Sequence, residues 1–134
     1  MRKAQTRYLN VDLDIYSRYD PQPLLDALGR KVIVLHAGRV EGKRGYEAHI
    51  ELSGNAKDAD KTIRTLCVLI KSLRGAARGL WDGATVRDFN IGAQAEEQPD
   101  CFEMGIEADT VKAVSEVNGR VVFSIYSPVK TSTE

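Results

Sequence analysis

Four polar side chains have the residue types that hold a metal ion or work as a general acid and base. Asp12 and Asp14 alternate along one segment near the start of the chain. His49 and Glu51 alternate along a second segment. Alternate residues of a β-strand project to the same side, so the four side chains form one patch if the two segments pair. Three carboxylates and an imidazole are suited to a divalent cation, and paired carboxylates are suited to acid–base chemistry. Neither a His-Glu-x-x-His motif nor an EF-hand loop accompanies them.

The same two segments also indicate an acidic docking surface. Carboxylates on adjacent strands repel one another, so such a surface lowers stability unless cations, hydrogen bonds or a partner compensate. We therefore expect it to dock a partner protein with a basic surface, and a merely solvated face is the plain alternative. Aromatic side chains often anchor interfaces. The contact residues that we expect are Asp12, Asp14, Glu47, Glu51, Tyr8 and Tyr16.

Alternation of apolar and polar residues predicts the two strands that position these side chains. Residues 8–16 and 46–52 each alternate strictly, which is typical of a strand with one buried face. In the first strand, the polar side is expected to hold Tyr8, Asn10, Asp12, Asp14 and Tyr16. Residues 31–36 are almost continuously apolar, which predicts a strand that is central or buried on both faces. Further strands are predicted at 86–92, 102–107 and 120–127.

Capping residues and helical spacing predict the helices. A short helix is expected to begin at Asp20 and to end at Gly29. Apolar residues between 63 and 81 recur every three or four positions and predict a long helix with a break near Gly75. A last helix is expected from Asp109 to Asn118.

The order of these elements, β-α-β-β-α-β-β-α-β, indicates an α+β protein. Its first six elements match the ferredoxin-like split βαβ pattern, which a C-terminal βαβ would extend, with the helices on one face of the sheet. The chain has 134 residues, of which 43% are hydrophobic and 28% charged, as in an ordinary globular protein. We therefore predict a single domain over residues 1–134, with frayed termini at 1–6 and 129–134.

The charge balance excludes any general attraction to nucleic acid or to an anionic membrane. Lys plus Arg and Asp plus Glu each total 19, so the formal net charge is zero. Arg44-Gly45-Tyr46 begins like the signature strand of RNA-recognition modules, but Ala48 stands at the next stacking position and acidic residues surround it. The sequence therefore argues against RNA binding through the sheet, although the basic long helix and the loop with Arg39, Lys43 and Arg44 keep it as a minor alternative.

Two further patterns bear on the compartment. No apolar stretch follows the basic N-terminus, and the longest apolar run, 66–70, is far too short to span a membrane, so we expect a cytoplasmic protein. Cys67 and Cys101 belong to no Cys-x-x-Cys pair and are expected to be free thiols. Cys67 falls on the apolar stripe of the long helix, which predicts a buried, unreactive thiol.

The sequence contains no motif that names a reaction or a cofactor. Gly-x-Ser-x-Gly, P-loop and dinucleotide-binding patterns are all missing from it. This favours a protein-binding module without a cofactor over an enzyme, and leaves catalysis open. The alternative is a metal-dependent hydrolase or a small-ligand-binding protein that uses Asp12, Asp14, His49 and Glu51. Both a monomer and a homodimer remain open.

Several packing and turn motifs carry a resemblance to known proteins. They are Leu13-Asp14-Ile15 followed by a polar turn and Leu-Leu-x-x-Leu-Gly, the stretch from Thr62 to Asp82, Phe89-Asn90-Ile91-Gly92, and Ile125-Tyr126-Ser127. On these motifs the chain resembles a family of small bacterial α+β domains of unknown function. Some proteins of this kind are candidate immunity proteins, which neutralise toxins by binding them. The resemblance covers most of the chain and implies a fold and a binding role, but no catalytic residue.

Overall fold

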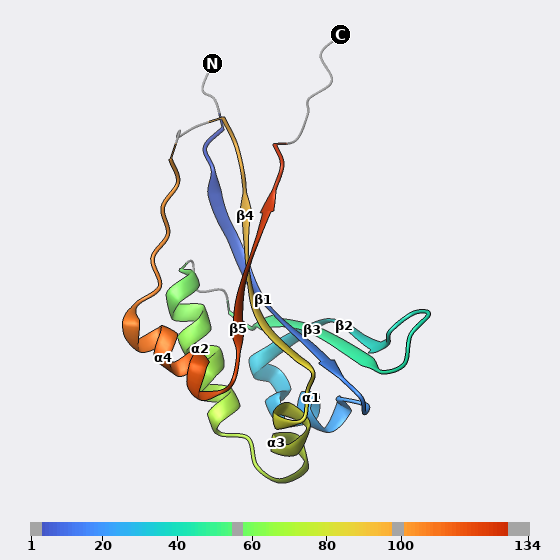
Figure 1. Ribbon diagram of the computed structural model, residues 1–134. Helices are drawn as coiled ribbons and strands as arrows, with labels where there is room; N and C mark the ends of the chain where they lie inside the picture. Colours follow the sequence, from blue (N-terminus) through green and yellow to red (C-terminus); the bar gives the residue numbers. More distant parts are fainter. Residues whose placement is uncertain (1–3, 55–57, 98–100, 129–134) are drawn as a thin grey trace.

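The computed structural model describes residues 4–54, 58–97 and 101–128. Over these residues the protein is a mixed α+β structure with a five-stranded sheet and four α-helices (Figure 1). The strands are β1 (Arg7–Ser17), β2 (Val32–Arg39), β3 (Tyr46–Leu52), β4 (Val86–Gln94) and β5 (Arg120–Tyr126). The helices are α1 (Gln22–Leu28), α2 (Ala59–Lys71), α3 (Gly75–Asp82) and α4 (Ala108–Glu116), with a short 3-10 turn at Gly29–Lys31.

The sheet is built around β1, which has a strand on either side. Its strand order is β2-β3-β1-β4-β5. β1 runs antiparallel to both β3 and β4, β2 runs antiparallel to β3, and only the β4–β5 pair is parallel among the described strands. The first residues of β1 and the last residues of β4 and β5 lie at the same end of the sheet. There they extend past the helices (Figure 1).

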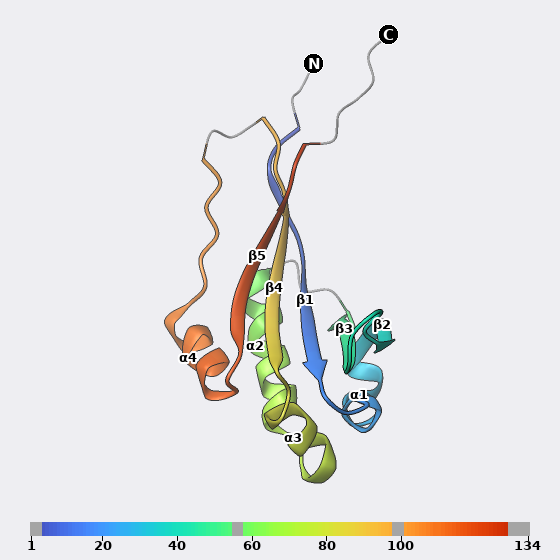
Figure 2. The ribbon, with the colours of Figure 1, turned by 45° about the vertical axis from the view of Figure 1, so that its right-hand side comes forward.

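One apolar layer joins the sheet to the helices. Val11, Leu13 and Ile15 of β1 are no more than 1% exposed, whereas the residues between them are partly exposed, as the alternation predicts. These side chains belong to a core cluster with side chains from the other elements, among them Ile50, Phe89, Ile91, Leu24, Ile63, Leu66 and Trp81. Figure 2 shows α2 behind β4 and β5. The core therefore lies on the odd-numbered side of β1.

The predicted break in the long helix is confirmed. α2 ends at Lys71 and α3 begins at Gly75, whose φ of 59° is a left-handed conformation that suits glycine. Asp58 begins α2 by accepting hydrogen bonds from the N–H groups of Asp60 and Lys61. Asn118, with a φ of 58°, ends the last helix at the predicted place.

Two predictions about the strands are wrong. Residues 102–107 are extended, but no described strand pairs with them, and Met104 and Ile106 instead pack against the core. The observed order of elements is therefore β-α-β-β-α-α-β-α-β, apart from the 3-10 turn. β2 lies at an edge of the sheet, with Ile33, Val34 and Leu35 between 45% and 50% exposed, so it is neither central nor buried on both faces. An apolar run shows that a strand has side chains suited to burial, but it does not show whether other elements pack against both of its faces.

The two edges of the sheet differ in regularity. The pairing of β2 with β3 is irregular between Val34 and His36, and such an irregularity hinders the addition of another strand. The pairing of β5 with β4 is regular throughout. Phe123 and Ile125 of β5 are 58% and 69% exposed. β5 thus presents an uninterrupted, apolar edge.

The two cysteines are free thiols, as predicted. Cys67 is 1% exposed, and burial raises its pKa to about 11, so it is a protonated, unreactive thiol at neutral pH. Cys101 is exposed. In the described part of the chain, no helix combines the length and the apolar character needed to cross a membrane.

The terminal segments that were expected to fray are described only in part. Residues 1–3 and 129–134 lie outside the described residues. Thr6, within the first segment, makes hydrogen bonds through its Oγ1 with the carbonyl and the N–H of Glu96, at 3.3 and 2.9 Å. The chain is therefore held to the far end of β4 from Thr6 onward.

Candidate functional site

Strand pairing brings the predicted acidic residues together on the side of the sheet opposite the core. The partner of Asp12 in β3 is Glu51, and the partner of Asp14 is His49. The partner of Tyr16 is Glu47. Residues that face each other across a strand pair point to the same side, so these six side chains share one surface. We call this surface the polar face, and it comprises Asn10, Asp12, Asp14, Tyr16, His36, Glu47, His49, Glu51, Asp88, Asn90 and Ser124.

A chain of polar contacts starts on the polar face at the β2 edge. The Nε2 atom of His36 lies 3.3 Å from Oε1 of Glu47. The same Oε1 atom lies 3.5 Å from Nε2 of His49. The other ring nitrogen of His49, Nδ1, lies 2.7 Å from Oδ1 of Asp14. His49 therefore lies between two carboxylates, and its ring also stacks on that of His36 with 6.0 Å between the centroids.

The chain of contacts continues from Asp14 to the opposite edge. Asn90 of β4 donates its Nδ2–H to Oδ2 of Asp14 at 3.3 Å. The hydroxyl of Ser124 in β5 donates to Oδ1 of Asn90 at 2.8 Å. The contacts thus cross all five described strands. Each of these contacts shares a residue with the next, so the side chains from His36 to Ser124 form a connected network rather than a set of independent side chains.

The electrostatic conflict of the polar face is concentrated at Asp12. Partial burial, together with the carboxylates of Asp14 and Glu51, raises the pKa of Asp12 to about 6. The amide of Asn10 lies between two of the acids, with its Nδ2 3.0 Å from Oδ1 of Asp12 and 3.3 Å from Oε2 of Glu51. At neutral pH Asp12 is therefore ionised at close range to two other acids, and a cation placed over them would be attracted strongly.

The two tyrosines predicted as contact residues lie on different sides of the sheet. Tyr16 is on the polar face, where its ring meets that of His49 edge-on with 5.8 Å between the centroids. The pairing of β1 with β4 shifts between Tyr8 and Asn10, and Tyr8 is paired with Ala93 on the core side. Tyr8 is partly buried against the core. The prediction that it shares a side with Asp12 is wrong, because a one-residue irregularity reverses the alternation.

The four residues weighed as metal ligands are neighbours but are not arranged as a metal site. In the part of the chain that the structure describes, no group of three or more His, Cys, Asp or Glu residues could hold a metal ion. The side chains are instead engaged with one another and with Asn10, since His49 is held by Asp14 and the amide of Asn10 contacts both Asp12 and Glu51.

Comparisons with models of protein families, with curated proteins and with solved structures found no match. The resemblance to small bacterial domains of unknown function therefore stays a prediction.

Sequence reasoning missed part of the polar face. His36, Asn90 and Ser124 were not assigned to it, although each has a contact in the network. Alternation within β4 was a usable signal, because Phe89 and Ile91 on one side place Asn90 on the other. Asp88 also lies on this side, where it makes two hydrogen bonds with the guanidinium of Arg120, at 2.9 and 2.7 Å, that balance its charge.

Proposed function

We propose that this chain is a small protein-binding module whose polar face docks a basic surface of a partner protein. The observation that carries the proposal is the strand register, which sets Asp12, Asp14, Glu47 and Glu51 on one surface opposite the core. The raised pKa of Asp12 supports it in part, because burial is its largest cause but the carboxylates of Asp14 and Glu51 also raise it, and a partner's Lys or Arg side chain would relieve the repulsion among these acids. The aromatic ring of Tyr16 adds an apolar anchor beside the acids.

We also infer that the fold is a ferredoxin-like split βαβ sheet, with the helices covering one side and β5 added at an edge. The order β2-β3-β1-β4, with every neighbouring pair antiparallel, supports this inference. The core cluster on the odd-numbered side of β1 supports it as well. In such a fold the polar face is the uncovered side of the sheet, which leaves it accessible to a partner.

An immunity protein is the specific form of this proposal that the resemblance favours. Such a protein acts by binding a toxin, so it needs a rapid and selective association more than it needs catalytic groups. Opposite charges on two surfaces accelerate encounter and suppress wrong partners. A toxin gene next to the gene for this chain would support this form, and co-expression with that toxin should then restore growth of a sensitive host.

The experiment compares two double variants with the same change of charge. Asp12→Asn with Asp14→Asn alters the polar face, and the control, Glu103→Gln with Asp109→Asn, alters two exposed acids elsewhere. We expect the immobilised wild-type protein and the control to capture the same basic partners from a lysate of the native host. The polar-face variant should lose them, or capture at least about tenfold less. Equal capture by both variants would reject the polar face as the docking surface.

A metal-dependent hydrolase or small-ligand-binding protein that uses Asp12, Asp14, His49 and Glu51 remains the competing function. The geometry favours docking over it, because these four side chains are committed to contacts within the network. A bound ion should raise the melting temperature by linkage. A rise of several degrees on adding Mn²⁺ or Zn²⁺, lost in the Asp12→Asn, Asp14→Asn variant, would favour the metal-dependent function.

A further inference from the structure

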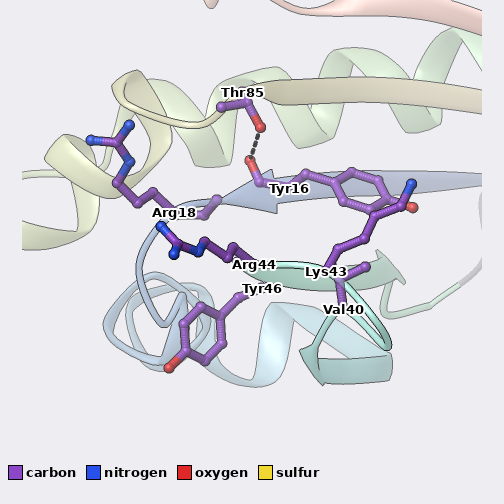
Figure 3. A pocket seen from close by; sticks show the side chains of 9 residues that line it. Tyr16, Arg18, Val40, Lys43, Arg44, Tyr46 and Thr85 are labelled. Atoms are coloured by element: carbon purple, nitrogen blue, oxygen red, sulfur yellow. Dashed lines mark hydrogen bonds between the residues drawn. The ribbon is translucent and has the colours of Figure 1, made fainter.

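A cleft with a volume of about 790 Å³ lies at the end of β1, beside the polar face but distinct from it (Figure 3). Tyr16 is the residue that the two sites share. The walls are the loop between β2 and β3 on one side and the turn that enters β4 on the other. The volume falls within the range of about 300–1,000 Å³ that is typical of small-molecule sites.

Backbone contacts hold both walls of the cleft in place. In the loop, the N–H of Val40 donates to the carbonyl of Gly45 at 3.0 Å, and the N–H of Lys43 donates to the carbonyl of Val40 at 3.3 Å. Gly45 has a φ of 104°, and a Cβ there would lie only 3.0 Å from the carbonyl oxygen of Ser17, so glycine lets the loop sit against β1. On the other wall, the N–H and the hydroxyl of Thr85 donate to the carbonyl of Tyr16, at 2.8 and 3.2 Å.

The cleft is positively charged and its charge is not neutralised from within. Arg18, Lys43 and Arg44 line it, and its described lining contains no Asp or Glu. None of these three cations forms an ion pair with a described carboxylate. Other basic side chains are paired, as Arg64 is with Asp60 and Arg78 with Asp82. The three cations of the cleft are therefore available to an anion.

The lining combines charge with apolar surface. In Figure 3 the guanidinium groups of Arg18 and Arg44 extend toward one side, and the ammonium group of Lys43 extends toward the other. The ring of Tyr16 and the side chain of Val40 also line the cleft. A ligand that satisfies both kinds of surface carries several negative charges and a planar or apolar group.

We propose that this cleft binds a phosphate-bearing small molecule of the nucleoside diphosphate class. Arg18 and Arg44 hold its phosphate groups, because guanidinium groups match phosphate oxygens in a forked geometry, and Lys43, whose ammonium group extends toward the other side of the cleft, adds a compact charge that attracts the same anion. Tyr16 and Val40 contact its base. The acids of the neighbouring polar face repel the phosphates and so confine them to the cationic part of the cleft.

The test is a calorimetric titration of the full chain with pyrophosphate, ADP, GDP and UDP. We expect pyrophosphate to bind, and at least one of the nucleotides to bind more tightly than pyrophosphate. The double variant Lys43→Gln with Arg44→Gln should weaken binding at least about tenfold, as expected when two charge-assisted contacts are lost. Arg18→Gln tests the third cation separately and should also weaken binding.

The matched control is Arg30→Gln with Lys31→Gln. It removes the same charge from two exposed residues that immediately precede β2, at the end of that strand away from the cleft loop. It should bind as the wild type does, whereas Asp12→Asn with Asp14→Asn, which removes acids that repel the phosphates, should bind at least as tightly as the wild type. Fluorescence of Trp81, the one tryptophan of the sequence, checks that each variant is folded. A failure of all four probes to bind at millimolar concentration, or equal losses in the cleft variant and its control, would overturn the proposal. Nucleotides that bind no more tightly than pyrophosphate would overturn the roles of Tyr16 and Val40.

Discussion

At the scale of single residues, the negative charges of the polar face lower the stability of the fold, and this effect is concentrated at Asp12. The pKa of Asp12 is about 6 in the folded protein, against an ordinary value of 3.8. Between these pH values the folded state keeps a proton that the unfolded state has released, so stability falls as the pH rises through this window. Above about pH 6 the cost of ionising Asp12 is fully present.

We predict that Asp12→Asn stabilises the protein at pH 7.5. The free energy of unfolding should rise by about 1 kcal/mol, less than the full linkage value because the carboxyl is partly solvated. This increase in the free energy of unfolding should become smaller as the pH falls from 7.5 to 4.5. Urea unfolding followed through Trp81 fluorescence measures the free energy at each pH. Asp14→Asn is the contrasting variant, and it should lose about 1 kcal/mol because its contact with His49, at 2.7 Å, is weakened. Destabilisation by Asp12→Asn at pH 7.5 would contradict this account.

The same proton affects the proposed docking. Asp12 becomes neutral below about pH 6, which removes one negative charge from the surface that attracts a basic partner. Association should therefore weaken as the pH falls from 7.5 to 5.5, and the Asp12→Asn variant should show less of this dependence than the wild type does.

At the scale of elements, Asp60 connects the first turns of α2 and α4. Its Oδ1 accepts a hydrogen bond from the N–H of Glu107 at 2.8 Å, and its Oδ2 accepts one from Nη2 of Arg64 at 2.9 Å. The Nε–H of Arg64 donates to the hydroxyl of buried Thr110 at 3.0 Å. Burial by itself would raise the pKa of Asp60, but the hydrogen bonds and the charge of Arg64 lower it overall.

We predict that Asp60→Asn lowers the free energy of unfolding by about 1–3 kcal/mol at pH 7, because a buried ionised acceptor is lost. A lowered pKa contributes stability above the ordinary value near 3.8 that is lost as the pH falls through the folded-state value. The difference in free energy of unfolding between Asp60→Asn and the wild type, measured by urea titration, should therefore become smaller below about pH 4. Asp82→Asn, which alters an exposed pair with Arg78, should cost less than about 0.5 kcal/mol. Equal costs for the two variants would refute the role of Asp60.

The turn from α4 into β5 depends on a glycine for a steric reason. A Cβ on Gly119 would lie 2.5 Å from Cε2 of Phe89 and 3.1 Å from Cγ1 of Val114, and the Phe89 ring is fully buried. Gly119→Ala should therefore lower the melting temperature, with a loss of about 1–3 kcal/mol. Gly79→Ala in α3 is the control, since nothing lies within 4 Å of its Cβ, and it should gain about 0.5–1 kcal/mol. A neutral Gly119→Ala would indicate that the Phe89 ring can move aside.

At the scale of the whole molecule, a zero net charge conceals two opposed surfaces. The acids of the polar face and the cations of the cleft meet at Tyr16. A molecule with this charge separation orients a charged partner before contact, and the effect is screened by salt. The two proposed sites are therefore selective for ligands of opposite sign.

The open edge of the sheet leads to a prediction about association. Between 121 and 126, β5 contains no Lys and no Pro, and Ile125 is 69% exposed. Such an edge favours pairing with another strand, so we expect reversible self-association at high protein concentration. Ile125→Lys should reduce it, as measured by light scattering across a concentration series. Ile33→Lys on the irregular β2 edge is the comparison, and an equal effect there would argue against pairing through β5.

The sequence by itself determined the local structure and the residue types of the polar face. Alternation in β1 and β3, the break before Gly75 and the end of the last helix all depend on residues close together in the chain, which is why they could be predicted. Tertiary structure alone decided which strands became neighbours, and it placed β2 at an edge and left 102–107 unpaired among the described strands.

The same distinction holds for the sites. Residues separated by more than thirty positions, such as Asp14 and His49, meet only because a particular register is adopted, and no local pattern specifies a register. The irregularity that turns Tyr8 toward the core, and the convergence of Arg18 with the loop that holds Lys43 and Arg44, likewise arise from contacts between distant segments. The chemistry of each side chain is fixed by its residue type and can be seen in the sequence. The distances between side chains, which decide whether they form a site, depend on how the strands pair.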